Sequence, residues 1–588
     1  MNERQLFYPA RAISERESTH ALLNCIIREY AIPGGYLAHH WPECRHGLMV
    51  APAEGVYPLA IHWPDGLALF ITVDRCSALG AHRYLSPLYM KRPDENDWCV
   101  FSMGQHVTTL LATLTGLEGV RNDELATQIS DSLETMTEIV QARHQAGSPL
   151  LDYVASEQGL WFGHPSHPAP KARHWPNDTD RDAVTPEHQA QCALYQFAVP
   201  KRGLEVVVNG LDEALIIDSV GRQHQARAGE VVISMHPVQA SLFKQAPAVQ
   251  ALLASGTLRD LGASGRRASP TASLRTWYVD QQPFFIKGSL NLRVTNCVRK
   301  NAWYELEGTL VIDRVLQTLV AENDPALARL RLAREPAVLW WAPPEVEEGQ
   351  RRWFMEQTGI IFRENFCLRE GRHRCVLTAT LVARNVDGNA LIDDFLPRHR
   401  QGGAGQYALN WFSAYLETLL APVLVLFFRY GVVLEPHLQN CVLIHDQGQP
   451  RDMLLRDFEG IKLVDGQGTR WMDAEIPGHV RDAMTYSRAQ GWRRVVYCLL
   501  INHLSEAVLA LSWNRPALAP ALWAQVREHL VEVRSTLGET EAPELDALLD
   551  GASLPCKTNL KVRLMAGADR EAGYVDLPSP WAMEVACA

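Results

Sequence analysis

The sequence predicts an α+β fold built from more than one domain. With 588 residues, the chain is too long for a single hydrophobic core and predicts two to four domains. Strand patterns gather between about residues 200 and 315, whereas helical patterns dominate after about residue 400. A strand-rich middle and a helix-rich end predict two lobes with a cleft between them.

Hydrophobic periodicity gives the individual elements. A helical stripe over residues 131–145 ends at Gly147-Ser148-Pro149, which predicts a first boundary near residue 150. We therefore expect domains at 1–150, 151–400 and 401–588. Strands are predicted at 67–73, 204–208, 214–217, 230–235, 276–279 and 284–295, and further helices at 407–430, 490–511 and 522–537.

Composition and charge exclude several classes of function. The net charge of −11 disfavours nucleic acid or an anionic membrane as the main partner. The 12 cysteines are scattered singly without a CxxC pair, which argues against a zinc site, an iron–sulfur cluster or a disulfide scaffold. No signal peptide is recognisable, and the longest apolar run, Leu419 to Phe428, is too short to span a bilayer. We expect a cytoplasmic enzyme that binds no membrane.

The most informative segment is a predicted β-hairpin with polar residues at its open end. Glu435-Pro-His437-Leu-Gln439-Asn440 precedes an apolar run, a turn near Gly448 and a second apolar run, which ends at Arg456-Asp457-Phe-Glu459-Gly460. An antiparallel hairpin would place Asn440 beside Asp457. Such a group suits a hard cation that carries nucleotide phosphates. A polar hairpin end with satisfied hydrogen bonds explains the same residues.

A second segment, residues 287–295, alternates between apolar and polar side chains. A strand here would bury Leu290, Leu292 and Val294 and display Lys287, Ser289, Asn291, Arg293 and Thr295 on its other face, with Arg299 following. Such a face suits a polyanion, either phosphates or a polycarboxylate. A solvated sheet face is the alternative interpretation.

Two shorter motifs carry hydroxyl, imidazole and cationic groups. The loop Gly163-His164-Pro-Ser-His167-Pro-Ala-Pro-Lys171-Ala-Arg173 is stiffened by three prolines and would suit anion capture, or would be an ordinary surface loop. Ser273-Leu-Arg275-Thr276 places a hydroxyl and a guanidinium at the start of a strand. The chain contains no Walker loop, GxSxG elbow or HExxH helix, so the common hydrolase and P-loop classes find no support.

Taken in order, these five motifs resemble the NRPS-independent siderophore synthetases of the aerobactin-synthetase (IucA/IucC) type. The resemblance implies a cupped-hand α+β architecture with thumb-like, fingers-like and palm-like domains and an ATP cleft between the two lobes. It also implies an ATP-dependent ligase that adenylates a carboxylate of citrate or a related polycarboxylic acid. An amine or hydroxyl then attacks to give an amide or ester, with AMP and pyrophosphate released. A homodimer is the assembly expected from the same likeness.

The resemblance also implies roles for individual residues. His164, Ser273, Arg275, Thr276, Lys287, Gln439 and Asp457 would bind ATP. Thr295, Arg299 and His437 would hold the polycarboxylate, and Lys287, Arg299 and His437 would act in catalysis. Glu435, Asn440 and Asp457 would line the magnesium region, with Asn440 and Asp457 as the preferred ligands.

Two other classes of function stay open from the sequence. Asn440 and Asp457 also mimic the magnesium pair of a kinase, although the chain has no His-Arg-Asp motif and no GxGxxG loop. A non-catalytic protein that only binds a polycarboxylate is the other alternative. The sequence identifies neither the acid nor the nucleophile, and does not say whether His437 is a base or a positioning group.

Overall fold

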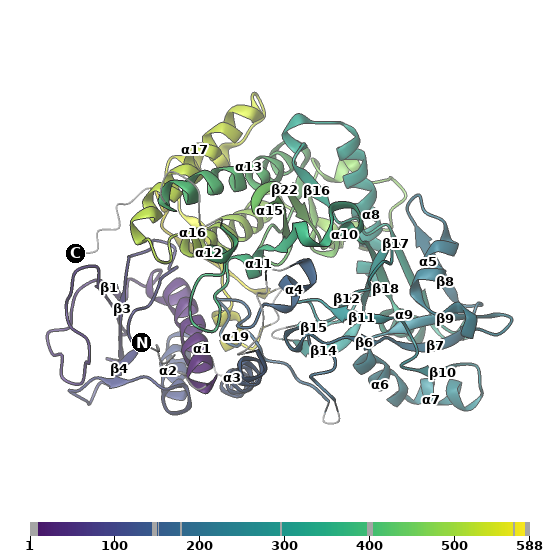
Figure 1. The fold of residues 1–588 in the computed structure, drawn as a ribbon, viewed down its shortest axis with the longest axis horizontal. Helices are drawn as coiled ribbons and strands as arrows, with labels where there is room; N and C mark the ends of the chain where they lie inside the picture. The colour runs from purple at the N-terminus through teal and green to yellow at the C-terminus, as the bar shows by residue number, and fades with distance from the viewer. Residues whose placement is uncertain are drawn as a thin grey trace, which may run out of the picture.

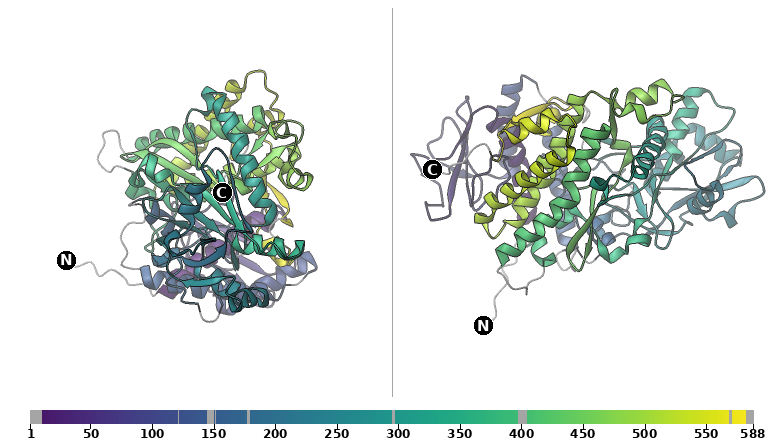
Figure 2. Two further views of the ribbon diagram at one scale, coloured as in Figure 1. Left: turned by 90° about the vertical axis from the view of Figure 1, so that its right-hand side faces the viewer. Right: turned by 90° about the horizontal axis from the view of Figure 1, so that it is seen from above.

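The computed structural model describes residues 10–120, 122–143, 150, 152–176, 179–294, 297–396, 404–567 and 571–581. Figure 1 shows the N-terminal elements at the lower left, the strand-rich middle of the chain on the right, and the helices of the last third across the upper left and top. Two further views separate these parts in depth (Figure 2). The α+β cupped-hand architecture with its strand-rich and helix-rich lobes is confirmed.

The N-terminal part pairs a five-stranded antiparallel sheet, in the order β1-β2-β3-β4-β5, with three helices. Its core also takes in Leu560 and Leu564 from the far end of the chain. There the Glu29 carboxylate accepts hydrogen bonds from the backbone N–H groups of Asn559, Leu560 and Lys561. The elements are α1 (Ala10–Ile26), the π-helix η1 (Ile27–Ala31), β1 (Leu37–Ala38), β2 (Tyr57–His62), β3 (Ala68–Val73), β4 (Tyr89–Lys91), β5 (Cys99–Val100), α2 (Met103–Glu118) and α3 (Glu124–Arg143).

The strand-rich part is built on a seven-stranded sheet in the order β6-β11-β12-β13-β18-β17-β8, beside the smaller sheet β10-β7-β9. Buried aromatic side chains such as Trp277, Phe354 and Phe362 form its core. The elements are α4 (Tyr153–Gln158), β6 (Cys192–Ala193), β7 (Tyr195–Pro200), β8 (Leu204–Val208), α5 (Glu213–Val220), β9 (Glu230–Met235), α6 (Pro237–Gln245), α7 (Pro247–Ala254), β10 (Arg259–Gly262), β11 (Arg267–Pro270), β12 (Thr276–Tyr278), β13 (Phe284–Gly288), β14 (Leu290–Val294), β15 (Cys297–Arg299), α8 (Trp303–Ala321), β16 (Leu330–Leu332), β17 (Ala337–Trp341), α9 (Glu348–Thr358), β18 (Ile360–Glu364), α10 (Phe366–Glu370), β19 (Cys375–Leu377), α11 (Thr378–Leu381) and α12 (Ile392–Phe395).

Two predictions for this part are wrong. Residues 214–217 lie in helix α5 and not in a strand, because the Asp212 side chain caps the helix by accepting from the Ala214 N–H. Four apolar residues are too few for periodicity to separate a helix from a strand. The expected strand 284–295 breaks at Ser289 into β13 and β14, which belong to different sheets.

The predicted hairpin is confirmed. Strands β21 (Cys441–Asp446) and β22 (Gln449–Leu455) pair in antiparallel register from Cys441 opposite Leu455 to Asp446 opposite Gln449. The two turn residues, Gln447 and Gly448, both have positive φ, as a tight hairpin turn requires. β16 and β19 flank the hairpin in a four-stranded sheet, so the strand-rich segment supplies both edge strands of this sheet.

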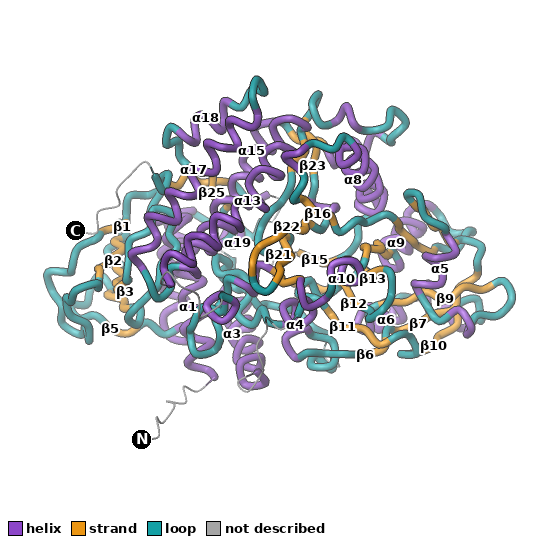
Figure 3. Tube along the Cα trace, turned by 45° about the horizontal axis from the view of Figure 1, so that its top comes forward, coloured by secondary structure: helices purple, strands orange, loops and turns teal. Residues whose placement is uncertain are grey.

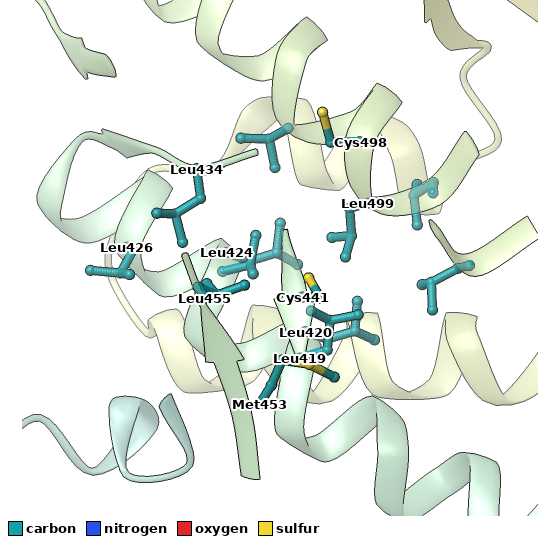
Figure 4. Close-up of a cluster of buried hydrophobic side chains, with 14 of the residues drawn as sticks. Leu419, Leu420, Leu424, Leu426, Leu434, Cys441, Met453, Leu455, Cys498 and Leu499 are labelled. Carbon is teal, nitrogen blue, oxygen red and sulfur yellow. The ribbon is translucent and has the colours of Figure 1, made fainter. Parts of the chain in front are cut away.

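The helix-rich part encloses this sheet with α13, the longest of the described helices. Figure 4 shows side chains of α13, the hairpin and the π-helix η8 meeting in one core, among them Leu420, Cys441, Leu455 and Leu499. Figure 3 shows α13, α15, α17 and α18 together at the upper left. The remaining elements are α13 (Ala404–Tyr430), β20 (Val432–Val433), η6 (Phe458–Gly460), β23 (Lys462–Val464), α14 (Gly478–Met484), β24 (Thr485–Tyr486), α15 (Arg488–Val496), η8 (Tyr497–Leu504), α16 (Ser505–Leu511), α17 (Ala519–Leu537), α18 (Pro543–Leu549), β25 (Leu554–Lys557), α19 (Leu560–Leu564) and β26 (Tyr574–Leu577).

Two helical stretches of the described chain, Gly405–Tyr430 and Arg488–Leu511, are long and apolar enough to cross a membrane. Within the protein, however, 78% and 89% of their most apolar windows are buried, as expected for core helices. The domain limits at residues 150 and 400 stay a prediction. The helix-rich core extends across the second limit, because it includes residues of α8 and of the segment 376–396.

Candidate functional site

One cavity of about 790 Å³ collects the residues that the motifs predict. It is lined by segments from the N-terminal, strand-rich and helix-rich parts of the chain. Of the 12 candidate site residues, Thr295 lies outside the described residues, and the others all line this cavity: His164, Ser273, Arg275, Thr276, Lys287, Arg299, Glu435, His437, Gln439, Asn440 and Asp457.

The open end of the hairpin positions Asn440 and Asp457. The Arg456 N–H donates to the Asn440 carbonyl at 3.1 Å, so that Asp457 follows one residue beyond the last backbone pairing. The Arg456 guanidinium is buried and pairs with Glu157 and with the Gln439 carbonyl. Asp457 itself has a left-handed backbone, with φ 75° and ψ 71°. A strained residue held by a buried anchor is typical of a functional site.

Lys287 lies at the centre of a buried charge cluster and not on a solvated face. Its side chain is only 2% exposed, and its ammonium forms an ion pair with Asp457 and lies 2.9 Å from Glu459 and 3.9 Å from Glu335. Arg363 contacts Glu335 and lies 3.2 Å from Asp457. The alternative of a solvated sheet face is therefore wrong for Lys287, which is buried among carboxylates and lines the cavity.

Electrostatics keeps the members of this cluster ionised. Burial opposes the charge on Lys287, but the surrounding carboxylates outweigh it and raise the pKa of the ammonium. Burial likewise opposes the charge on Asp457, yet Lys287 and Arg363 hold the pKa of its carboxyl far below the ordinary value. For Glu459, Arg275 and Lys287 outweigh burial and lower the pKa to about 2.

The Ser273–Thr276 turn aims a guanidinium into the same cluster. The Thr276 N–H donates to the Ser273 hydroxyl at 3.2 Å, and Leu274 adopts a positive φ of 67°. Arg275, which is 6% exposed, pairs with Glu459 at 2.8 Å and donates to the Asn301 side chain. Arg275 and Lys287 thus share Glu459, a carboxylate for which the sequence suggested no role.

His437 is held as a neutral imidazole with a defined tautomer. Burial lowers its pKa below the ordinary value, and its Nδ1 accepts the Gln439 N–H at 3.2 Å. A neutral ring that accepts at Nδ1 carries its proton on Nε2, so Nε2 is the nitrogen from which His437 can donate. His503 in η8 fixes this loop, because its Nδ1 lies 2.8 Å from the Pro436 carbonyl. Short π-helical segments are frequent at functional sites.

The proline-stiffened loop only partly matches its prediction. His164, His167, Lys171 and Arg173 all line the cavity. However, Lys171 is buried and lies 2.6 Å from Glu187, and the Arg173 guanidinium contacts the same carboxylate. Both cations of the loop therefore already have a carboxylate partner within the protein, and their capture of an anion stays a prediction.

A magnesium ion would need oxygen ligands from the nucleotide. Among the described residues, no group of three or more His, Cys, Asp or Glu side chains could hold a metal alone. Asn440 and Asp457 line the cavity from adjoining strand ends, which fits the usual magnesium site of one or two protein ligands plus phosphates. Glu435, the third predicted ligand, lies 2.9 Å from Arg494, which already neutralises it.

Sequence reasoning missed several residues of the site. Arg363 and Arg456 line the cavity, as do Glu305 and Glu459. Arg363 gave a signal as the single cation that follows the apolar run Ile360–Phe362 in β18. Arg456 and Glu459 flank Asp457 in the same motif. The residues with which these side chains pair lie far away in the sequence, so no local sequence pattern indicated the pairing.

Comparisons with known proteins agree with this geometry. Residues 152–383 match the profile of the IucA / IucC family, and residues 409–572 match that of the ferric iron reductase FhuF-like transporters. The chain is 25% identical to a spermidine-citrate ligase of Bacillus anthracis, over 98% of this chain and 99% of the relative. It is 24% identical to an N(2)-citryl-N(6)-acetyl-N(6)-hydroxylysine synthase of Vibrio mimicus, over 90% and 91%.

Solved structures share the whole fold. ATP-bound aerobactin synthetase IucA of Klebsiella pneumoniae superposes with a TM-score of 0.83 at 22% identity, over 96% of this chain and 99% of that one. The petrobactin biosynthesis protein AsbB of Bacillus anthracis gives a TM-score of 0.75 at 19% identity, over 97% and 96%. Residues 152–383 thus match the IucA / IucC family, and the whole chain is similar to these relatives in sequence and to the solved synthetases in fold.

Proposed function

We propose that the protein is an ATP-dependent ligase of siderophore biosynthesis. It adenylates a carboxylate of citrate or a related polycarboxylic acid and then joins it to an amine or hydroxyl. One observation carries the proposal. Residues between positions 164 and 457, far apart in the chain, line a single cavity with the chemistry that both steps need. Relatives that match over nearly their full length include a spermidine-citrate ligase and an N(2)-citryl-N(6)-acetyl-N(6)-hydroxylysine synthase.

In the first step, a carboxylate oxygen of the acid attacks the α-phosphorus of ATP, and pyrophosphate leaves. Arg275 and Lys287 are the proposed phosphate ligands, helped by His164, Ser273, Thr276 and Gln439. Before ATP binds, Glu459 occupies both cations. We propose that the phosphates take its place, since preorganised cations around the transferring phosphorus are the main source of catalysis in such sites.

Asn440 and Asp457 are the proposed protein ligands of magnesium, with Glu435 at the edge of the same region. When bound, the ion would disperse negative charge on the phosphates. Asp457 stays ionised beside Lys287 and Arg363, so its carboxylate is available at neutral pH. Arg456 holds the open end of the hairpin in place through its ion pair with Glu157.

The polycarboxylate is proposed to lie against Arg299 and His437. Arg299 is half-buried in the cavity lining and can bind a carboxylate in a bidentate manner. The His437 Nε2–H would donate to an oxygen of the acid, which makes His437 a positioning and charge-stabilising donor in the resting state. Thr295, the third proposed ligand, lies outside the described residues.

In the second step, the neutral amine or hydroxyl attacks the acyl carbon, the bond to the AMP oxygen breaks and the nucleophile loses a proton. Adenylation makes this possible because AMP leaves far more readily than oxide.

We also propose that the enzyme is a homodimer of the cytoplasm. Sedimentation of the purified protein would test the dimer.

Product analysis tests the proposed activity. The purified enzyme is incubated with ATP, magnesium and each of citrate, a citrate mono-amide, 2-oxoglutarate and a succinyl hydroxamate, with hydroxylamine as the trapping nucleophile. We expect AMP, pyrophosphate and an acyl-hydroxamate with at least one acid. ADP in place of AMP would establish a kinase, and binding without nucleotide turnover would establish a non-catalytic binding protein.

A further inference from the structure

One carboxylate in the cavity differs from the other acidic groups around it. Six of the described acidic side chains line the cavity. Five of them form an ion pair with an arginine or a lysine: Glu17, Glu435, Asp457, Glu459 and Glu506. The sixth, Glu305 of α8, forms no ion pair in the described part of the chain. Glu305 is therefore open to a role that the proposed function has not assigned.

The fold places Glu305 beside the residues proposed for the acid. Only residues 300–302 separate Arg299, at the end of β15, from the start of α8. Arg299 and Glu305 both line the cavity. Asn301 fixes this connection, because its buried side chain donates to the Lys287 carbonyl at 3.1 Å. Glu305 is thus held next to the proposed acid site and near the Lys287 cluster.

The two oxygens of the Glu305 carboxylate have different surroundings. Oε2 accepts the Ala302 N–H at 2.8 Å, which caps the first turn of α8. Oε1 accepts no hydrogen bond from the residues that the structure describes. The helix therefore orients the carboxylate and leaves one oxygen available to a molecule in the cavity.

The surroundings of Glu305 make its carboxyl titrate near neutral pH. Burial and the Glu459 carboxylate raise its pKa to about 7, because Arg275 and Lys287 compensate less. The charged groups that face it are Glu459 of η6, Arg275 before β12, Lys287 of β13 and Lys462 of β23. α14, which lies on the same side, contributes apolar side chains there. A carboxyl with such a pKa can accept and release a proton under working conditions.

Three other groups of the site are poorer proton acceptors. The Nδ1 of His437 already accepts a backbone N–H, and its Nε2 carries the proton. Burial lowers the pKa of His164 to about 3, and the Asn502 side chain lies 2.6 Å from its Nε2. The pKa of Glu459 is lowered to about 2. An effective base needs an open lone pair and a pKa near the working pH, and each of these groups lacks at least one.

We propose that Glu305 is the catalytic base of the second step. Its Oε1 takes the N–H or O–H proton of the nucleophile while the nitrogen or oxygen forms its bond to the acyl carbon. The bond from the acyl carbon to the AMP oxygen breaks, AMP leaves with that electron pair, and Glu305 then releases the proton to solvent. This inference rests on the proposed ligase activity and adds the proton acceptor that its second step requires.

Separate measurement of the two half-reactions tests Glu305. Exchange of labelled pyrophosphate into ATP, with citrate or the acid identified by product analysis and without a nucleophile, reports adenylation alone. Acyl-hydroxamate formation with hydroxylamine reports both steps. Glu305→Gln should lower hydroxamate formation by about a hundredfold or more. The exchange should change little, because attack of a carboxylate on the α-phosphorus releases no proton.

Matched variants separate catalysis from folding. Glu305→Gln should keep the helix start, since a glutamine at this position also accepts the Ala302 N–H. Glu305→Asp keeps a carboxylate and should recover part of the rate. Glu307→Gln removes a carboxylate of the same helix that lies outside the cavity lining, where it pairs with His479. This control should leave both half-reactions unchanged.

The pH dependence adds a readout that a structural role would not change. The ratio of the wild-type kcat/KM for hydroxylamine to that of Glu305→Gln should rise as the pH passes about 7, because Glu305 must be ionised to accept a proton. The ionisation of hydroxylamine itself cancels in this ratio. A ratio independent of pH, equal losses in the two half-reactions, or wild-type hydroxamate formation by Glu305→Gln would overturn the proposal. Absence of both half-reactions in the wild type would instead reject the ligase activity and the inference that rests on it.

Discussion

Lys171 and Lys287 are two buried lysines beside carboxylates in the same cavity, yet their pKa values move in opposite directions. Burial lowers the pKa of Lys171 to about 8, because its one carboxylate partner, Glu187, is shared with the repelling Arg173. Burial acts on Lys287 in the same sense, but Asp457, Glu335 and Glu459 together outweigh it and raise the pKa. The ratio of cations to carboxylates, and not burial, decides the outcome.

The difference also separates structure from function. The Lys171 cluster consists of two cations locked on one carboxylate, and it fastens the proline-stiffened loop. In the Lys287 cluster, the cations are shared among several carboxylates. We propose that these cations can exchange a carboxylate partner for a phosphate oxygen when the nucleotide binds. We therefore expect changes in the first cluster to reduce stability and changes in the second to reduce activity.

The largest expected effect is at Lys287. Lys287→Met removes the cation that Asp457 and Glu459 share, and we expect pyrophosphate release to fall about a thousandfold. The variant also leaves buried carboxylates with less compensation, so the urea midpoint should be measured alongside activity. Activity within about tenfold of the wild type in folded protein would show that the cluster is structural, like its counterpart at Lys171.

Glu187→Gln tests the other cluster. The change leaves Lys171 and Arg173 buried without a countercharge, and we expect a loss of about 3 kcal/mol in the free energy of unfolding. Glu187 itself is not among the residues that line the cavity, so the folded variant should keep most of its turnover. Urea denaturation measures the first effect, and a specific activity corrected for the folded fraction measures the second. A folded variant without turnover would contradict the separation of roles.

His437→Ala sharpens the functional side of the comparison. Loss of the Nε2–H donor should lower acyl-hydroxamate formation by about two orders of magnitude. His437→Gln, which keeps a donor but cannot act as a base at neutral pH, should recover part of the loss if His437 positions the acid. Equal losses in the two variants would favour a role as base, and near-normal turnover in both would remove His437 from the mechanism.

The smallest expected effect is a pH dependence carried by Lys171. Its pKa is about 8 in the folded protein and about 10.5 in the unfolded chain, so between these values the unfolded chain binds more protons. The free energy of unfolding should therefore rise with pH in this window relative to Lys171→Met, by at most about 1.4 kcal/mol per pH unit. Denaturation of both proteins across the window measures the difference. If the free energy of unfolding of Lys171→Met still rises with pH in this window, another titratable group causes the dependence.

Local patterns predicted much of the fold correctly. The hairpin with its turn at Gln447-Gly448 was predictable because glycine after a turn-forming residue, between two apolar runs, specifies a tight reversal. The helix at 407–430 was predictable from its sustained apolar pattern. The helical state of residues 214–217 was not predictable, because four apolar residues fit the period of a helix and the period of a strand equally well. The cap at Asp212 favours the helix.

The sequence alone determined which residue types the site contains and in what order the motifs occur, because side-chain chemistry and local backbone preference are properties of short segments. Only the tertiary structure decided which charges meet. Lys287 and Asp457 are 170 positions apart and Lys171 and Glu187 only 16, yet both contacts result from packing. The charge state of a buried group depends on every ionised neighbour within a few ångströms, and those neighbours are set by how distant segments pack.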